Sequence, residues 1–62
     1  MNLEKLEKYI KESDYTTTEL ASMLGISRVM LWNYRKGNSK ISLNIALELA
    51  QILGIPLEEL LN

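Results

Sequence analysis

The chain contains no cysteine, no histidine and no phenylalanine among its 62 residues. Without cysteine it forms neither disulfides nor thiolate metal sites, which makes a reducing cytoplasm the expected compartment. Without histidine it lacks the commonest general base and metal ligand, and it has no glycine-rich phosphate loop. The carboxylates are scattered over helix faces that are expected to be exposed. We therefore expect neither enzymatic activity nor a bound metal or cofactor, and the sequence indicates no small-molecule ligand.

Long apolar runs are absent as well. No segment approaches the ~20 apolar residues of a membrane-spanning helix, and the N-terminus alternates charge with leucine, unlike a signal peptide. Apolar residues nevertheless make up 47% of the chain and charged residues 24%, a balance typical of a globular domain. The sequence thus predicts one small domain over residues 1–62 that makes no contact with a membrane.

The strongest local pattern lies between Thr16 and Gly37, in the stretch TTTELASMLGISRVMLWNYRKG. Thr16 followed three residues later by Glu19 is a capping box, which begins a helix. Gly25 can end this helix because glycine adopts a left-handed backbone without steric cost. Ser27 is then a suitable N-cap for a second helix, which Gly37 would end. The two helices and their tight turn predict a helix-turn-helix motif over residues 16–37.

The second helix of this motif has two different faces. At 100° per residue, Leu31 and Tyr34 fall on the side that would pack against the domain. The opposite side combines a β-branched residue, an indole, an amide and a cation, and Arg28 borders it. These four side chains are Val29, Trp32, Asn33 and Lys36. Such a mixed surface is expected to contact something outside the protein.

The net charge of −1 is unusual for a nucleic-acid-binding domain, because such domains are usually basic. The distribution of charge is more informative than the total. Between Leu20 and Leu47 every charged residue is basic, and the acidic residues all lie in the flanks. The basic residues of this segment are Arg28, Arg35, Lys36 and Lys40. Because a phosphate responds to the local field, we expect DNA binding that salt readily weakens.

Polar residues flank the second helix of the motif. A helix N-terminus offers free N–H groups and a partial positive charge, so Thr17 and Thr18 can contact a phosphate as well as begin the first helix. The loop after Gly37 can lie along a DNA backbone. Its donors are Asn38, Ser39 and Lys40. Plain capping and a plain connector are the alternatives.

Three further helices are expected around the motif. The first covers residues 2–11, and its exposed face pairs Glu7 with Lys11 at i,i+4 spacing. The fourth covers residues 43–53 and carries a broad apolar stripe. The last is a short turn that Pro56 opens as its first helical residue.

The last two helices carry more apolar residues than one face can hold. Leu47 widens the stripe of the fourth helix, and Leu57, Leu60 and Leu61 can close the core. Because exposed apolar patches mark interfaces, we expect part of this surplus to mediate homodimerisation through the C-terminal helices. The alternative is that all of it fills the core of a monomer.

The chain resembles a helix-turn-helix domain of the Cro/CI type, also called the xenobiotic-response-element family of bacterial and phage transcriptional regulators. The resemblance covers nearly the whole chain from Tyr15 onward and rests on the combined spacing of its residues. The matching residues are Thr16, Glu19-Leu20-Ala21, Leu24-Gly25-Ile26-Ser27-Arg28, Leu31, Gly37, Ser42-Leu43, Leu49-Ala50, Leu53-Gly54-Ile55 and Leu57-Glu58-Glu59-Leu60-Leu61. The resemblance implies an all-α, five-helix, lambda-repressor-like domain that binds operator DNA as a dimer, with its third helix in the major groove.

The resemblance also implies, by position, which side chains meet DNA. Base contacts are implied for Arg28, Val29 and Asn33, and Trp32 is predicted to join them on the same face. Phosphate contacts are implied for Thr17, Lys36, Asn38 and Lys40, and are predicted for Thr18, Ser27 and Ser39 as well. The expected function is a repressor that occupies a palindromic operator in double-stranded DNA.

Several positions depart from the family pattern, among them Ile41, where a proline is common. Thr17 stands where glutamine is common, and Arg35 stands where an acidic residue, a structural ion-pair partner, is usual. The largest departure is Trp32, because small or polar residues are usual there. Either Trp32 and Val29 contact thymine methyl groups, or the outward face binds a protein, or the helix is rotated so that Trp32 is buried. The alternative function is accordingly a protein-interaction module, antitoxin-like or a co-regulator, on the same fold.

Overall fold

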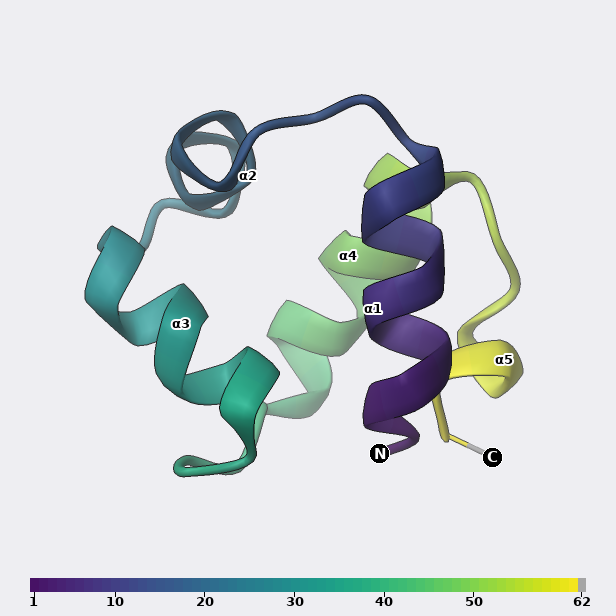
Figure 1. Cartoon of the computed structure of the whole chain (residues 1–62). Helices are drawn as coiled ribbons and strands as arrows, with labels where there is room; N and C mark the ends of the chain where they lie inside the picture. Colours follow the sequence, from purple (N-terminus) through teal and green to yellow (C-terminus); the bar gives the residue numbers. More distant parts are fainter. Residues whose placement is uncertain (62) are drawn as a thin grey trace.

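A computed structural model describes residues 1–61 of the chain (Figure 1). Within them the chain forms five helices and no strand. The helices are α1 (Leu3–Glu12), α2 (Thr17–Leu24), α3 (Arg28–Lys36), α4 (Leu43–Leu53) and α5 (Leu57–Leu61). The predicted all-α, five-helix architecture is therefore confirmed. None of these helices is long and apolar enough to cross a membrane.

Side-chain N-caps begin the first four helices; those at Thr16, Ser27 and Ser42 were predicted, whereas Asn2 was predicted as a residue of the first helix and is its N-cap. Asn2, Thr16, Ser27 and Ser42 each accept a hydrogen bond from the backbone N–H three residues further on. At Thr16 the capping box is complete, because the backbone N–H of Thr16 also donates to Oε1 of Glu19 at 2.9 Å. These bonds satisfy N–H groups that a helix start leaves without partners, which is why the predicted starts are confirmed.

Glycine ends the two helices of the motif as predicted. Gly25 and Gly37 have φ values of 70° and 77°, in the left-handed region, and their N–H groups bond back to the preceding turn. At Gly37 the absence of a side chain also has a packing role. A Cβ there would lie 3.0 Å from Cδ1 of Leu3, so α1 packs directly on the end of α3.

The core receives one fully buried leucine from each of the five described helices. These are Leu6, Leu20, Leu31, Leu49 and Leu60, each 0% exposed. Around them α1 packs against α3 and α5, α2 against α3 and α4, and α4 against α5. In Figure 1, α3 lies on one side of the molecule and α5 on the opposite side. One face of α3 thus remains open to solvent.

The C-terminal helices differ in detail from the prediction. Leu60 is buried, but Leu47 and Leu61, predicted to belong to the core, are 44% and 49% exposed. For Leu47 the reason is that α4 is apolar on most of its circumference, whereas only one face of this helix can reach the core of so small a domain. The alternative in which all the surplus apolar residues are buried is therefore wrong. Pro56 was predicted as the first residue of the last helix, but α5 begins one residue later, at Leu57. A difference of one residue is within the uncertainty of assigning a helix end.

Candidate nucleic-acid interface

The outward face of α3 is exposed as the periodicity predicts. Leu31 is 0% exposed and anchors the helix in the core, whereas Val29 and Trp32 are 68% and 51% exposed. Lys36 is exposed and Asn33 is half-buried on the same side. The interpretation in which α3 rotates to bury Trp32 is therefore wrong, because Leu31 fills the core position and one residue further turns the side chain by about 100°.

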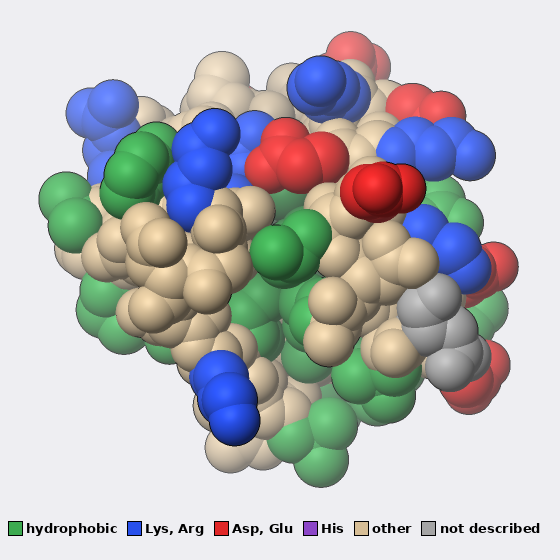
Figure 2. All heavy atoms as spheres, turned by 60° about the horizontal axis from the view of Figure 1, so that its bottom comes forward, with side chains coloured by type: hydrophobic (Ala, Val, Ile, Leu, Met, Phe, Trp, Pro, Cys, Tyr) green, Lys and Arg blue, Asp and Glu red, His purple; other side chains and the backbone are tan. Residues whose placement is uncertain are grey.

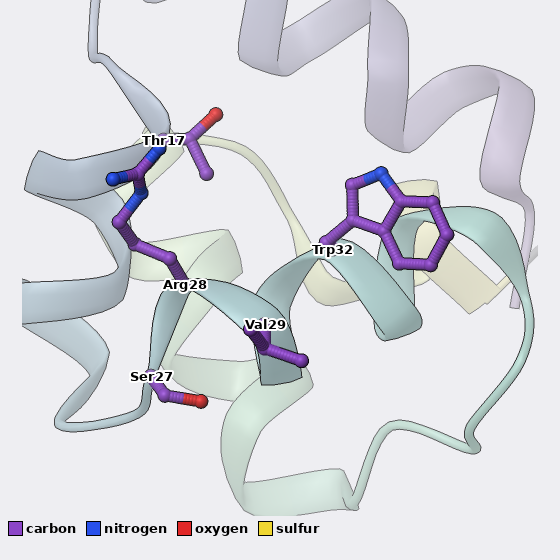
Figure 3. Close-up of a pocket in the computed structure, with 5 residues that line it drawn as sticks. All are labelled: Thr17, Ser27, Arg28, Val29 and Trp32. Atoms are coloured by element: carbon purple, nitrogen blue, oxygen red, sulfur yellow. The ribbon is translucent and has the colours of Figure 1, made fainter.

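An open hollow lies where α2 and α3 meet. It is lined by Thr17, Ser27, Arg28, Val29 and Trp32. Figure 3 shows Arg28 extending along one side of it toward Thr17, while the indole of Trp32 stands on the other side. The structure thus brings together five of the predicted site residues, with apolar groups and hydrogen-bond donors in one place.

The hydroxyl groups around this hollow already accept hydrogen bonds from the protein. Ser27 Oγ accepts from the backbone N–H of Met30 at 3.0 Å, and Thr17 Oγ1 accepts from Nη1 of Arg35 at 3.0 Å. A hydroxyl that accepts one bond still has its own proton to donate. Both side chains can therefore donate to an anion, and the neighbouring Thr18 is exposed.

Arg35 is paired with a carboxylate, whereas the sequence suggested that it adds a free cation to the basic segment. Its Nε and Nη2 donate to Oε1 and Oε2 of Glu7 at 2.7 and 2.8 Å, a two-pronged ion pair between α3 and α1. Hydrogen bonding to Arg35 holds the pKa of Glu7 below its ordinary value, with Lys11 and Lys36 acting in the same direction against the opposing effect of burial. The ion-pair partner of Glu7 is therefore Arg35 on α3, whereas Lys11, predicted as its partner on the same helix, acts on its charge without forming a described ion pair. An ion pair is thus present at Arg35, the position at which the sequence resemblance led us to expect an acidic ion-pair partner.

The positive surface is consequently smaller than the sequence alone indicates. With Arg35 paired to Glu7, the cations that remain in this segment are Arg28, Lys36 and Lys40, which are exposed and form no ion pair within residues 1–61. Figure 2 shows lysine and arginine side chains on both sides of this view, whereas the acidic side chains in view lie in the middle and at the right. The side where α3 lies, at the left, thus shows cations without neighbouring carboxylates in this view.

The loop that follows α3 is tied to the helix by an asparagine pair. Asn38 donates its backbone N–H to the carbonyl oxygen of Asn33 at 2.9 Å, and its Nδ2 lies 3.4 Å from Oδ1 of Asn33. Asn38, Ser39 and Lys40 are all exposed. The residues predicted to contact phosphates therefore form two groups: Thr17 and Ser27 line the hollow beside Arg28, with Thr18 next to Thr17 on α2, and Lys36 and the loop lie at the end of α3.

Sequence reasoning missed two of these contacts. Neither the Glu7–Arg35 pair nor the Asn33–Asn38 pair follows from a local pattern. For the first, a signal existed: an arginine at a position that usually holds an acidic ion-pair partner implies that a carboxylate lies opposite.

The sequence is similar to a known family and to longer proteins. A family model described as helix-turn-helix matches residues 6–60. A provisionally named HTH-type transcriptional regulatory protein of Pyrococcus horikoshii is 47% identical over 53 residues, which cover 86% of this chain and 17% of that protein. For similarly named proteins of Pyrococcus furiosus and Thermococcus gammatolerans the identities are 41% and 37%, with 87% and 95% of this chain and 17% and 19% of those proteins covered. The chain thus spans less than a fifth of the length of these curated relatives. Among solved structures, none matches it significantly.

Proposed function

Because the chain belongs to the helix-turn-helix family of the Cro/CI, or xenobiotic-response-element, type, we propose that it is a sequence-specific domain that binds double-stranded DNA in a transcriptional regulator. The proposed unit is residues 1–62, with the motif at residues 16–37. Its function is binding and involves no catalytic step. Its proposed place of action is the cytoplasm, with the chromosomal DNA.

The observation that carries this proposal is the placement of α3. Its exposed face lies between the two groups of residues predicted to contact phosphates. The nine residues of α3 span about 13 Å at 1.5 Å per residue. The major groove is about 12 Å wide and admits one α-helix. A helix of this length, with donors at both ends, can therefore read base edges while the donors meet phosphates on either side.

The exposed side chains of α3 suit base recognition. Arg28 can donate two hydrogen bonds to guanine, and Asn33 can both donate to and accept from adenine. Val29 and Trp32 present apolar surface to thymine methyl groups. Arg28 extends toward Thr17 in the free protein, so a phosphate contact is the competing role for its guanidinium.

The predicted phosphate contacts fix orientation and register. We assign this role to Thr17, Thr18, Ser27, Lys36, Asn38, Ser39 and Lys40. Contacts of this kind carry no sequence information but supply much of the affinity. Because three cations of the segment are unpaired, the slope of log K against log salt is expected to be modest, about −2.7 if all three meet phosphates.

We further propose that two copies bind a palindromic operator and repress transcription by blocking polymerase. Exposed leucines support the dimer: Leu43 and Leu47, one turn apart on α4, are 65% and 44% exposed, and Leu61 on α5 is 49% exposed. Half-sites would then lie about one helical turn apart, at roughly 34 Å.

Selection of bound sites from a random duplex DNA pool, at two salt concentrations, tests the proposal. An enriched palindrome with salt-sensitive affinity is expected. Enrichment of a single half-site would retain DNA binding and remove the dimer. No enrichment even at low salt would refute the proposal for this chain.

A protein-interaction module is the second candidate function. It is favoured by the apolar character of α3, where Val29, Met30 and Trp32 are 68%, 44% and 51% exposed, because aromatic residues and methionine are enriched in protein interfaces. If a protein partner covers Trp32 and shields it from solvent, while no duplex is enriched in the selection, this second function replaces the first.

A further inference from the structure

Arg35 joins three helices at the edge of the proposed interface. Two of its donors hold Glu7 on α1, and Nη1 donates to Oγ1 of Thr17 at the start of α2 at 3.0 Å. The side chains of Arg35 and Glu7 are only 21% and 32% exposed, so water competes weakly for these bonds. One guanidinium group on α3 thus fixes the residue of α2 to which a phosphate contact is assigned.

The chemistry of the guanidinium restricts the direction of the Thr17 hydroxyl proton. A guanidinium has five N–H donors and no acceptor. Toward Arg35, Thr17 can therefore only accept, and its single O–H proton must point elsewhere. Within residues 1–61 no protein group accepts this proton, and Figure 3 shows the hydroxyl oxygen turned away from Arg28 as well. The proton is available to an acceptor outside the protein.

A carboxylate at position 35 would have the opposite effect. Because it has only acceptors, it would take the proton of Thr17 and would also place a negative charge beside a phosphate. The order of charges in the ion pair, with the acid on α1 and the base on α3, therefore decides whether Thr17 donates outward or inward.

We propose that Arg35 is a positioning residue for DNA binding, which fixes Thr17 as a hydrogen-bond donor to a backbone phosphate. This inference rests on the proposed function. It goes beyond the base and phosphate contacts assigned above because Arg35 is not proposed to contact DNA itself. It gives a role in binding to a cation that the ion pair removes from the positive surface.

A thermodynamic cycle on the duplex selected from the random pool tests the inference. Thr17→Val removes the hydroxyl and keeps the shape of the side chain. The second background combines Glu7→Arg with Arg35→Glu, which exchanges the charges and leaves the net charge of the chain unchanged. In the natural background Thr17→Val should raise Kd about tenfold, as expected for a lost bond to a charged acceptor. In the exchanged background it should change Kd by no more than about twofold, because the carboxylate already holds the proton.

Thr18→Val is the matched control, since Thr18 is the next residue of α2 and is exposed. Its effect on Kd should be equal in both backgrounds. Circular dichroism establishes that each background is folded. If the exchanged pair does not fold, Glu7→Gln with Arg35→Glu provides an acceptor at position 35 whose partner is an amide N–H.

Each outcome decides between the alternatives. A large effect of Thr17→Val in the natural background and none in the exchanged one supports the role of Arg35. Equal effects in both backgrounds, or no effect in either, would overturn that role and leave DNA binding intact. If the unaltered chain binds no selected duplex, the proposed function and this inference fall together.

Discussion

Removal of the Glu7 carboxylate should destabilise the fold more than removal of an exposed carboxylate on the same helix. In Glu7→Gln the side chain keeps its size but loses its charge. One of the two bonds to Arg35, at 2.7 and 2.8 Å, is then lost as well, because an amide N–H would face a guanidinium N–H. Arg35 would remain, largely buried, without a counter-charge.

The magnitude follows from the burial of the pair. Exposed ion pairs contribute about 0.2–1 kcal/mol, whereas breaking a buried pair costs about 3–5 kcal/mol. With side chains 21% and 32% exposed, the Glu7–Arg35 pair lies between these limits, and we expect a loss of about 2 kcal/mol. For a domain of this size 1 kcal/mol changes Tm by about 4–8 °C, so the Tm of the variant should fall by about 10 °C.

The stabilisation that the Glu7–Arg35 pair gives the fold should decrease as the pH falls. Hydrogen bonding to Arg35 lowers the pKa of Glu7 in the folded state below its ordinary value of 4.5, so the unfolded chain binds a proton more readily than the folded one. The stabilisation is therefore complete above about pH 5 and is lost as the pH falls through the lowered pKa. The difference in Tm between the natural chain and Glu7→Gln should accordingly narrow on acidification.

Thermal unfolding followed by circular dichroism, from pH 7 down to about pH 3, measures both effects. Glu4→Gln is the control, because Glu4 is an exposed carboxylate of α1. Equal Tm values for the two variants at pH 7 would show that the pair contributes no more than a surface ion pair. A difference that persists unchanged at the lowest pH would refute the assignment of the effect to the Glu7 charge.

Further predictions concern binding and backbone geometry. Arg28→Ala should cost about 1–3 kcal/mol of binding free energy and relax specificity at one base pair, whereas an unchanged motif in a repeated site selection would assign Arg28 to phosphate. Lys40→Ala should weaken binding to all sequences alike and reduce the slope of log K against log salt by about 1 in titrations. Replacing the contacted thymine by uracil should cost about 0.8 kcal/mol, and Val29→Ala should reduce that difference. Gly37→Ala should lower Tm more than Gly25→Ala, because both have positive φ but only a Cβ at position 37 would lie 3.0 Å from an α1 side chain.

The helix boundaries and the outward face of α3 could be predicted because their determinants are local. The capping box of Thr16 and Glu19 acts within three residues, and Gly37 ends α3 through its own backbone angle. The exposure of Val29 and Trp32 follows from helical periodicity once Leu31 is assigned to the core. What those exposed side chains bind stays a prediction.

The remaining features depend on packing between helices. Glu7 and Arg35 are far apart in sequence, and the carboxylate meets the guanidinium only because α1 lies against α3. On α4 the apolar stripe does indicate the core side, and Ala46, Leu49 and Ala50 are buried, but so broad a stripe does not show where its buried part ends, so the exposure of Leu47 could not be predicted. In both cases the missing information is the relative orientation of two helices.

Trp32 is the single tryptophan of the chain, and half of it is exposed in the folded state. The exposed part of its side chain is in contact with water in the folded protein. Contact with another molecule at the α3 face would remove that water and alter the emission of the indole. The chain therefore carries an intrinsic fluorescent probe at the α3 face, so occupancy of this surface can be followed without attaching a dye.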